Sequence, residues 1–510
     1  MPRYAAIDIG SNSLRMLAAD AGAGGAITTL AEDRQVTRLG ESVFRTGAIS
    51  EEAIRFVCAA LTRMADAYKK LDVVGIRAVA TSAVRDASNQ TEFVERATEA
   101  IGAPVEIISG LEEARLIHLG VQVRWPHPAE RILLIDIGGG SAEFISGEGG
   151  LLRHGFSRPL GAVRLTEVFL KHDPPTPTEI HQLEEFIEEK LAPVREKIGM
   201  GPFDAVIGTS SSAAAVVCAV NRIPRARRDE ADHMKATLPQ LRKLYADLLS
   251  RDLAGRRKIT GIGPRRAEIV IPGAAVLVRT LEDFKLPRVH YSRAGVRDGI
   301  IADLAARGVG REFTHLSRDQ KKAVEELARH YGVDVRHARK VAGLAHTLFV
   351  SLQTLHRLPP YYGRLLEAAA YLRDSGHYVS DTSHHKHSLY LIANSDLPAF
   401  TAVERRIIAV LCRYHRKALP SAKHDVYQAL TPDHRRAVLL LTPLLRIADA
   451  LDRSREQRVE EIRVALRNGS IDLGLLSEKD TDLEQWAAER AAESFQQIYE
   501  CALNVSRITP

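Results

Sequence analysis

Two short stretches of this chain repeat one pattern. The first reads Ala-Ile-Asp-Ile-Gly-Ser-Asn-Ser over residues 6–13, and the second reads Ile-Asp-Ile-Gly-Gly-Gly-Ser-Ala over residues 135–142. In each, an apolar run with one Asp leads into a turn of small residues, after which apolar sequence resumes, as in a β-hairpin. The copies are separated by about the length of a domain, ~100–150 residues. The sequence therefore predicts two related half-domains whose hairpin loops face one another across a cleft.

The composition of the two loops is typical of an anion site. Glycine and serine expose backbone N–H groups and let an anion approach closely, and an Asp beside such a turn can hold Mg²⁺ against phosphate oxygens. Asp136 and Glu143 stand on opposite arms of the second predicted hairpin, where both would reach one Mg²⁺, and Asp8 would face them from the other half. The loop residues predicted to bind phosphate are Ser11, Asn12, Ser13, Gly138, Gly139, Gly140 and Ser141.

Length and composition bound the remaining classes. A chain of 510 residues is too long for one core, and its 45% apolar and 26% charged residues indicate that most of it is folded. The net charge of +6 is compatible with a polyanionic partner. The four cysteines are far apart, which favours a reducing, cytoplasmic location without disulfides. No signal peptide and no apolar run of the roughly 18 residues that span a bilayer is evident, so no membrane partner is expected.

Local patterns divide the chain into four parts. Strands alternate with helices over residues 1–125 and again over residues 126–307, which predicts two α/β domains. Residues 308–458 carry apolar side chains at helical spacing throughout, so we expect a helical domain. Residues 459–510 alternate apolar and polar positions before a closing helix, and they predict a small α/β extension.

Several stretches, in the family's order, resemble signatures of the exopolyphosphatase / guanosine pentaphosphate phosphohydrolase (Ppx/GppA) family. They are Asp8-Ile-Gly-Ser-Asn-Ser13, Ile108-Ser-Gly-Leu-Glu-Glu-Ala114, Asp136-Ile-Gly-Gly-Gly-Ser-Ala-Glu143, Gly208-Thr-Ser-Ser-Ser212 and Gly295-Val-Arg-Asp-Gly-Ile300, the last with Asp298 in place of the usual Glu. The resemblance implies a duplicated actin-like, ribonuclease-H-like fold of the actin–sugar kinase–Hsp70 superfamily. It also extends to the long, four-domain members, and it implies a homodimer.

The resemblance assigns roles to individual residues. Glu113 matches the family's catalytic glutamate and would act as the general base that activates water, although the spacing alone does not separate it from Glu112. Arg85 matches an arginine that reaches substrate phosphate, a role that suits the guanidinium fork. Arg266 and Arg297 are further candidates of that kind, and Thr209 and Ser210 belong to the later phosphate loop. A metal role is implied for Asp136, Glu143 and Asp8, with Mg²⁺ as the expected ion, Mn²⁺ as an alternative and a monovalent cation as a further option.

The helical half contains a stretch that resembles the His-Asp dyad of HD-type phosphohydrolases. Tyr371-Leu-Arg-Asp-Ser-Gly376 has Arg373 where that motif has histidine, while Asp374 remains. His346 is placed where an upstream ligand would lie, and Asp449 where the last Asp would lie. A guanidinium cannot ligate a metal. We therefore expect a degenerate HD-like domain without hydrolase activity of its own, which serves dimerisation and extends a basic groove.

The lead hypothesis is a metal-dependent exopolyphosphatase that removes terminal orthophosphate processively from inorganic polyphosphate. The alternative within the family is hydrolysis of guanosine pentaphosphate (pppGpp) to the tetraphosphate, or both activities in one cleft. A more distant alternative is a small-molecule kinase of the same superfamily, which would need an adenine pocket. Nucleic acid is not an expected partner, because the basic clusters lack interleaved aromatic residues and the aromatic content is only 5%.

Overall fold

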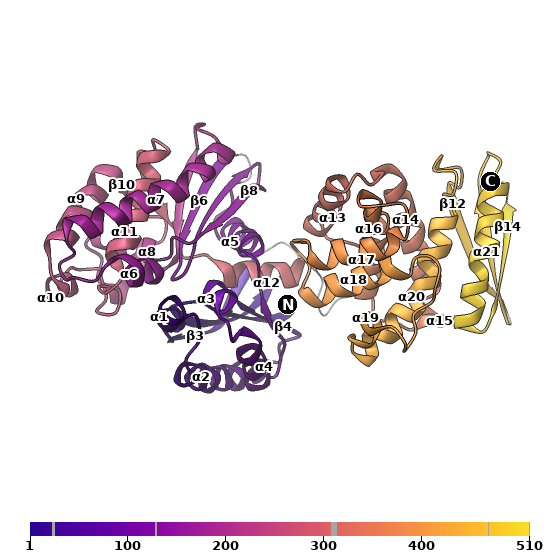
Figure 1. Cartoon of the computed structure of the whole chain (residues 1–510), viewed down its shortest axis with the longest axis horizontal. Helices are drawn as coiled ribbons and strands as arrows, with labels where there is room; N and C mark the ends of the chain where they lie inside the picture. The colour runs from indigo at the N-terminus through magenta and orange to yellow at the C-terminus, as the bar shows by residue number, and fades with distance from the viewer. Residues whose placement is uncertain (23–25, 128–129, 308–313, 468, 509–510) are drawn as a thin grey trace. The chain divides into compact units, whose positions relative to one another are not determined.

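The computed structural model describes residues 1–22, 26–127, 130–307, 314–467 and 469–508, so the first residues of the helical domain predicted from 308 lie outside it. The chain forms two compact units, Met1–Gly310 and Arg311–Pro510, each of which is described by itself (Figure 1). None of the helices in the described part of the chain combines the length and the apolar character that a membrane span requires.

The first unit contains two β-sheets that repeat one topology. The strands of the first sheet, which forms the first lobe, are β1 (Arg3–Ile9), β2 (Ser13–Ala21), β3 (Ile27–Val36), β4 (Gly75–Ala80) and β5 (Val105–Ile107). Those of the second sheet, in the second lobe, are β6 (Arg131–Ile137), β7 (Ala142–Glu148), β8 (Leu151–Arg158), β9 (Ala205–Thr209), β10 (Lys235–Thr237) and β11 (Arg288–Tyr291). The orders are β3-β2-β1-β4-β5 and β10-β11-β9-β6-β7-β8. In each lobe three antiparallel strands are followed by two parallel ones, and the second sheet adds β10, which is antiparallel to β11. The predicted duplicated α/β fold is therefore confirmed.

One face of each sheet is covered by helices of the same lobe. In the first lobe they are α1 (Leu39–Thr46), α2 (Glu51–Lys69), α3 (Ser82–Asp86) and α4 (Gln90–Ile101). In the second lobe they are α6 (Ala162–Phe169), α7 (Pro177–Ile198), α8 (Ser210–Val220), α9 (Leu238–Ser250), α10 (Leu253–Arg257) and α11 (Val270–Asp283), with the short 3₁₀ helix η1 (Arg225–Ala231). Helix α2 is typical: the Ser50 side chain caps its first turn, and its apolar stripe is buried.

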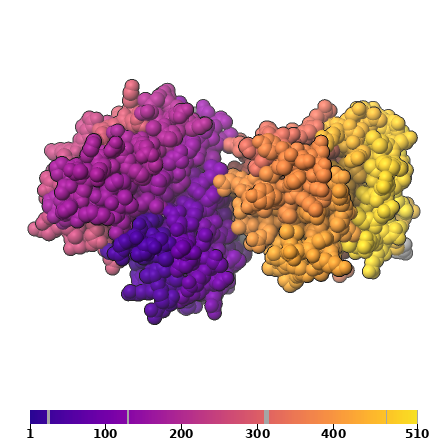
Figure 2. All heavy atoms as spheres, in the orientation of Figure 1, coloured from indigo at the N-terminus to yellow at the C-terminus, as the bar shows by residue number. Residues whose placement is uncertain are grey.

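The opposite face of each sheet is covered by a helix from the other half of the sequence. Helix α5 (Gly110–Arg124) follows the first lobe in sequence but buries Ile117 and Val121 against strands of the second sheet. Helix α12 (Val296–Ala306) follows the second lobe and packs Ile300 and Leu304 against the first sheet. Both faces of each central strand are therefore buried, which explains the continuous apolar runs that precede the hairpin loops. Figure 1 shows α5 and α12 between the lobes, and the lobes' side chains, indigo and magenta, meet in Figure 2.

The second unit is mostly helical and ends in a small sheet. Its helices are α13 (Arg318–His330), α14 (Val335–Ser351), α15 (Gln353–His356), α16 (Tyr361–Leu372), η2 (Ser375–Tyr378), α17 (His384–Asn394), α18 (Ala402–Tyr414), α19 (Asp425–Gln428), α20 (Pro432–Ala450) and α21 (Asp482–Tyr499). Its strands are β12 (Glu461–Arg467), β13 (Ser470–Leu476) and β14 (Ala502–Ile508), in the order β12-β13-β14. A single apolar cluster runs from α13 to β14, so the helices and the terminal sheet share one core.

Candidate active site

The two hairpin loops close in the same way and lie against one another. The Gly10 N–H donates to the Ser13 carbonyl at 3.1 Å, and the Gly138 N–H donates to the Ser141 carbonyl at 3.0 Å. A Cβ at Gly139 would stand 3.0 Å from the Ser11 Cβ, which is tighter than ordinary van der Waals contact. Only a residue without a side chain allows this close approach of the two loops.

A cavity of about 100 Å³ opens between these loops, and most of the predicted site residues line it. They are Asp8, Ser11, Asn12, Ser13, Glu113, Asp136, Gly138, Gly139, Gly140, Ser141, Ser210, Arg266 and Arg297. The other predicted residues lie just behind the wall. The Thr209 hydroxyl donates to Asp136 Oδ2 at 2.5 Å, and Arg85 Nη1 lies 3.7 Å from Glu113 Oε2.

Asp136 and Glu143 face each other directly across the β6–β7 hairpin. Directly opposed side chains in an antiparallel pair lie on the same face of the sheet. Burial raises the pKa of Asp136 to about 6, against the hydrogen bond from Thr209. Burial and the neighbouring charge of Asp136 raise the pKa of Glu143 to about 8, although the Ser157 hydroxyl donates to it at 2.7 Å. Burial also raises the pKa of Asp8. These carboxylates therefore lack sufficient compensating positive charge from the protein.

The structure distinguishes Glu113 from its neighbour Glu112. Both lie in the first turn of α5, which begins at the Ser109 cap. Glu112 points away from the cavity and pairs with Arg77 at 3.0 Å and with Arg115 at 2.8 Å. Glu113 lines the cavity, and its Oε2 accepts no hydrogen bond from any described residue. Burial, followed by the charge of Glu143, raises its pKa well above the ordinary value, and Arg85 opposes that rise.

Arg15 also lines the cavity, although the sequence pattern did not predict it as a site residue. It is the cross-strand partner of Asp8, at the spacing that separates Asp136 from Glu143. One hairpin thus presents two carboxylates and the other a carboxylate with a guanidinium, a contrast that comparing the two repeats would have revealed. Arg15 Nη2 donates to the Ser211 hydroxyl at 2.5 Å. Arg228 and Arg293 also line the cavity and were likewise not predicted.

The guanidinium groups around the cavity are crowded. Burial and the charges of Arg15 and Arg228 lower the pKa of Arg266 to about 9. Burial and the charge of Arg15 likewise lower the pKa of Arg34, which lines a neighbouring pocket, to about 9. Both side chains remain charged at neutral pH, so this wall concentrates positive charge that an anion would neutralise.

The donor set suits Mg²⁺. Mg²⁺ prefers oxygen ligands and is held in proteins by one or two carboxylates together with substrate phosphates. Asp8, Asp136 and Glu143 supply buried carboxylate oxygens, and the burial that raises each pKa would be offset by a divalent cation. These residues therefore fit the implied ion, and Glu113 remains available beside them.

Glu143 gives a prediction on pH. Because its pKa in the folded protein is about 8, the protein without metal loses stability as the pH rises from about 4.5 through 8, when a buried charge must form. In EDTA, Glu143→Gln should raise the free energy of unfolding at pH 8.5, by on the order of 3 kcal/mol, and should have little effect at pH 5. Denaturant titrations at both pH values test this. The control is Glu148→Gln, at the exposed end of the same strand. An equal effect of Glu143→Gln at the two pH values would contradict the prediction.

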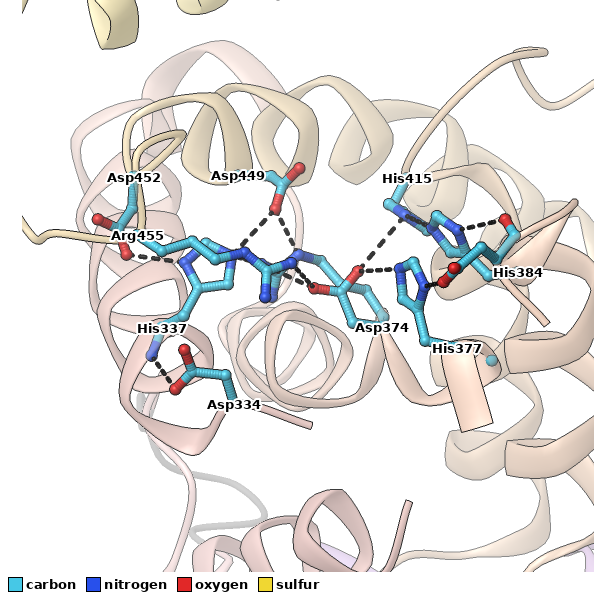
Figure 3. A network of polar contacts seen from close by, with 12 residues as sticks. Asp334, His337, Asp374, His377, His384, His415, Asp449, Asp452 and Arg455 are labelled. Atoms are coloured by element: carbon cyan, nitrogen blue, oxygen red, sulfur yellow. Dashed lines mark hydrogen bonds and ion pairs between the residues drawn. The ribbon is translucent and has the colours of Figure 1, made fainter. Parts of the chain in front are cut away.

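The helical unit requires one correction. His346 does not join Asp374 and Asp449, because it stacks on His315 with ring centroids 3.4 Å apart, near Glu367. His337, at the start of α14, takes the position beside Asp449 (Figure 3). Both histidines lie on α14, and sequence spacing did not show which of them faces Asp449.

Arg373 fills the place where the HD motif has histidine. Its side chain is fully buried. Its Nε donates to Asp449 Oδ1 at 2.6 Å, and its Nη2 donates to His337 Nε2 at 2.5 Å. The guanidinium thus occupies the space between His337 and Asp449.

Comparisons with known proteins place the chain in a family. The Ppx/GppA phosphatase family model matches residues 18–307, and the model of Ppx/GppA phosphatase domain III matches residues 320–490. A Ppx/GppA family member of known structure from Aquifex aeolicus is 30% identical, with a TM-score of 0.53, and the match covers 60% of this chain and 97% of that one. An exopolyphosphatase from Cytophaga hutchinsonii is 26% identical, with a TM-score of 0.55 and coverage of 59% and 97%. The chain therefore belongs to the Ppx/GppA phosphatase family, a family of hydrolases.

Proposed function

We propose that this protein is an exopolyphosphatase that hydrolyses the terminal phosphoanhydride bond of inorganic polyphosphate and releases orthophosphate. The observation that carries the proposal is the extension of the cavity into further arginine-lined space. A pocket of about 390 Å³ shares Arg228 and Arg266 with the cavity. Its wall adds Arg34, Arg225 and Arg265. A polyanionic chain with its last phosphoryl group at the hairpin loops would find cations along its length.

Hydrolysis of a phosphoanhydride requires a positioned water and neutralised phosphoryl oxygens. Glu113 Oε2 accepts no hydrogen bond from the described residues, and its nearest cation, Arg85 Nη1, lies 3.7 Å away, so it can accept a proton from water. Burial makes it a stronger base. The N–H groups and hydroxyls of the two loops would bind the terminal phosphoryl group, and Arg15, Arg266 and Arg297 would neutralise it. Mg²⁺, when held by Asp8, Asp136 and Glu143, would supply further positive charge to the phosphate oxygens.

Hydrolysis of guanosine pentaphosphate is the second candidate. The wall of the 390 Å³ pocket also contains small and apolar residues, among them Val36, Ala214 and Ala215, against which a base can lie. A nucleotide would place its phosphates at the same loops, and Glu113 would perform the same step. The arginines along the pocket favour the longer polyanion.

The test compares orthophosphate release from long-chain polyphosphate and from guanosine pentaphosphate, each with Mg²⁺ and with EDTA. We expect release that depends on Mg²⁺ and is faster from polyphosphate. Faster release from the nucleotide would replace the first proposal by the second. Release from neither substrate would contradict both.

The arginine wall gives a prediction on chain length. The double variant Arg34→Gln, Arg228→Gln should raise KM for long-chain polyphosphate about 10-fold or more, because each lost charge-assisted hydrogen bond costs roughly 1.5–3 kcal/mol. Hydrolysis of tripolyphosphate, which is too short to extend far along the wall, should change less. Steady-state kinetics on both substrates measure the contrast. Arg55→Gln, an exposed arginine on α2, is the control. Equal losses on the two substrates would show that the wall does not bind the chain.

A further inference from the structure

A polar pocket of about 470 Å³ in the helical unit brings three imidazoles to one carboxylate. Asp374 follows the end of α16, His377 lies in η2, His384 opens α17 and His415 follows α18. Figure 3 shows the His377 and His415 rings directed toward Asp374, with His384 beside them. Ligand atoms of Asp374, His377 and His384 lie within 4.8 Å of one another, outside the cleft of the first unit. His415 joins them from α18, with its Nε2 3.2 Å from His384 Nε2 and 4.0 Å from Asp374 Oδ1.

Hydrogen bonds at the far side of the rings orient two of these imidazoles. His415 Nδ1 lies 2.7 Å from the Cys412 carbonyl, which can only accept, so Nδ1 carries the proton. His377 Nδ1 lies 2.6 Å from the Asp381 carboxylate, which also accepts, so this Nδ1 carries the proton as well. Both Nε2 atoms therefore present a lone pair to the pocket. This is the outer-shell arrangement that metal-binding histidines have, with the second ring nitrogen held by a carbonyl or carboxylate.

His384 completes the set. Its Nε2 faces His415 Nε2 at 3.2 Å, and its Nδ1 has the Asp381 carbonyl at 3.4 Å and Arg416 Nη1 at 3.3 Å. Without an ion, the His384 Nε2–H donates to His415. An ion on Nε2 requires the proton on Nδ1, where the Asp381 carbonyl can accept it and where the Arg416 guanidinium, which can only donate, would have to turn away. The 3.2 Å separation is close to the ~3.3 Å between two nitrogens that bind one tetrahedral Zn²⁺ at ~2.0 Å.

Asp374 separates this cluster from the buried guanidinium. Its Oδ1 faces His377 Nε2 at 3.9 Å and His415 Nε2 at 4.0 Å. Its Oδ2 faces Arg373 at 3.5 Å and Arg455 at 3.7 Å. The arginine that fills the space between His337 and Asp449 therefore leaves the imidazole side of Asp374 open to a cation.

We propose that Asp374, His377, His384 and His415 form a transition-metal site whose open side takes a phosphate oxygen of an anionic ligand. Three imidazoles with one carboxylate suit Zn²⁺ and related ions rather than Mg²⁺, which prefers oxygen ligands. The ligand class follows from the rim of the pocket, where Arg416, Lys417, Arg453 and Arg455 supply positive charge. The site binds the metal ion and the anionic ligand, and the proposal requires no hydrolytic step.

The experiment uses the full chain, stripped with EDTA and titrated with Co²⁺, whose absorption reports tetrahedral nitrogen ligands. Excess Mg²⁺ is kept present to fill the oxygen-rich cleft of the first unit. We expect one Co²⁺ per chain with a tetrahedral spectrum. His377→Ala and His415→Ala should each weaken binding by more than the ~10–100-fold that outer-shell changes cost, and Asp381→Ala should weaken it within that range. His387→Ala, on the same helix α17 but outside the cluster, should bind like the unaltered chain.

His377 is partly exposed, so its replacement tests the site with little risk to folding. Absence of Co²⁺ binding to the intact chain overturns the proposal. Co²⁺ that persists in both His377→Ala and His415→Ala but is lost in His315→Ala also overturns it, because the ion then belongs to His315, His346 and Glu367. The anion is tested with inorganic phosphate, which should shift the Co²⁺ spectrum of the intact chain and shift that of Lys417→Met less. An unchanged spectrum in the intact chain contradicts the anion part of the proposal.

Discussion

Glu113→Gln is expected to lower kcat for polyphosphate about 10²–10⁴-fold, the usual contribution of a positioned general base. The amide keeps the size of the side chain but cannot accept the proton of the attacking water. Because Glu113 Oε2 accepts no hydrogen bond from a described residue, the substitution removes no structural hydrogen bond at that atom. The substitution should therefore lower the free energy of unfolding little. Because burial opposes the carboxylate charge, the variant should gain stability relative to the unaltered protein as the pH rises.

Glu112→Gln is the matched comparison, one residue earlier on the same helix. It removes a charge that pairs with Arg77 and Arg115, so we expect lower stability with near-normal kcat at temperatures where the protein stays folded. The assignment of the base fails if Glu113→Gln turns over like the unaltered enzyme, or if Glu112→Gln is inactive while folded. Orthophosphate release and denaturant unfolding on both variants give the answer.

Asp303→Asn is expected to lower the stability of the first unit by about 3–5 kcal/mol, the cost of removing one partner from a buried ionic network. Asp303 lies on α12 and pairs with Arg77 of β4 at 3.2 Å, with Arg115 of α5 at 2.8 Å and with Arg307 at 2.7 Å. These side chains are at most 7% exposed. The amide would leave three guanidinium groups buried with less negative charge among them.

The two tryptophans allow this loss to be measured in the first unit alone. Trp125 belongs to the first unit and Trp486 to the second. In a Trp486→Phe background, fluorescence during denaturant unfolding reports the unit that contains Asp303. Glu51→Gln, which breaks the exposed pair with Arg96, should cost far less in the same assay, because solvent screens exposed ion pairs. A loss for Asp303→Asn as small as that of Glu51→Gln would show that the network does not stabilise the unit.

The sequence predicted the hairpins and their duplication because both depend on local pattern. An apolar run, a turn of small residues and a second apolar run together favour a β-hairpin. Repetition of the pattern predicts two such hairpin loops. The same pattern placed Asp136 opposite Glu143. These features need no knowledge of how distant segments pack.

Other features depend on packing that no local pattern contains. Successive helical residues are turned by about 100°, so whether Glu112 or Glu113 enters the cavity depends on how α5 lies on the second sheet. The choice between His337 and His346 depends in the same way on how α14 is rotated toward Asp449. Arg34 and Arg228 come from β3 and η1, which are far apart in sequence and line one pocket only in the folded protein.

Helix α5 covers the second sheet and helix α12 covers the first. This arrangement has a consequence for how the chain folds during synthesis. Residues of β1 and β2 such as Tyr4 and Leu17 are covered by α12, the last helix of the first unit. A ribosome that has made the whole first sheet has therefore not yet made the helix that covers its inner face, and domains otherwise tend to fold as they emerge, N-terminal first. This apolar face stays exposed until Ala306 has left the exit tunnel, so the first lobe completes its fold only after the second lobe has been translated.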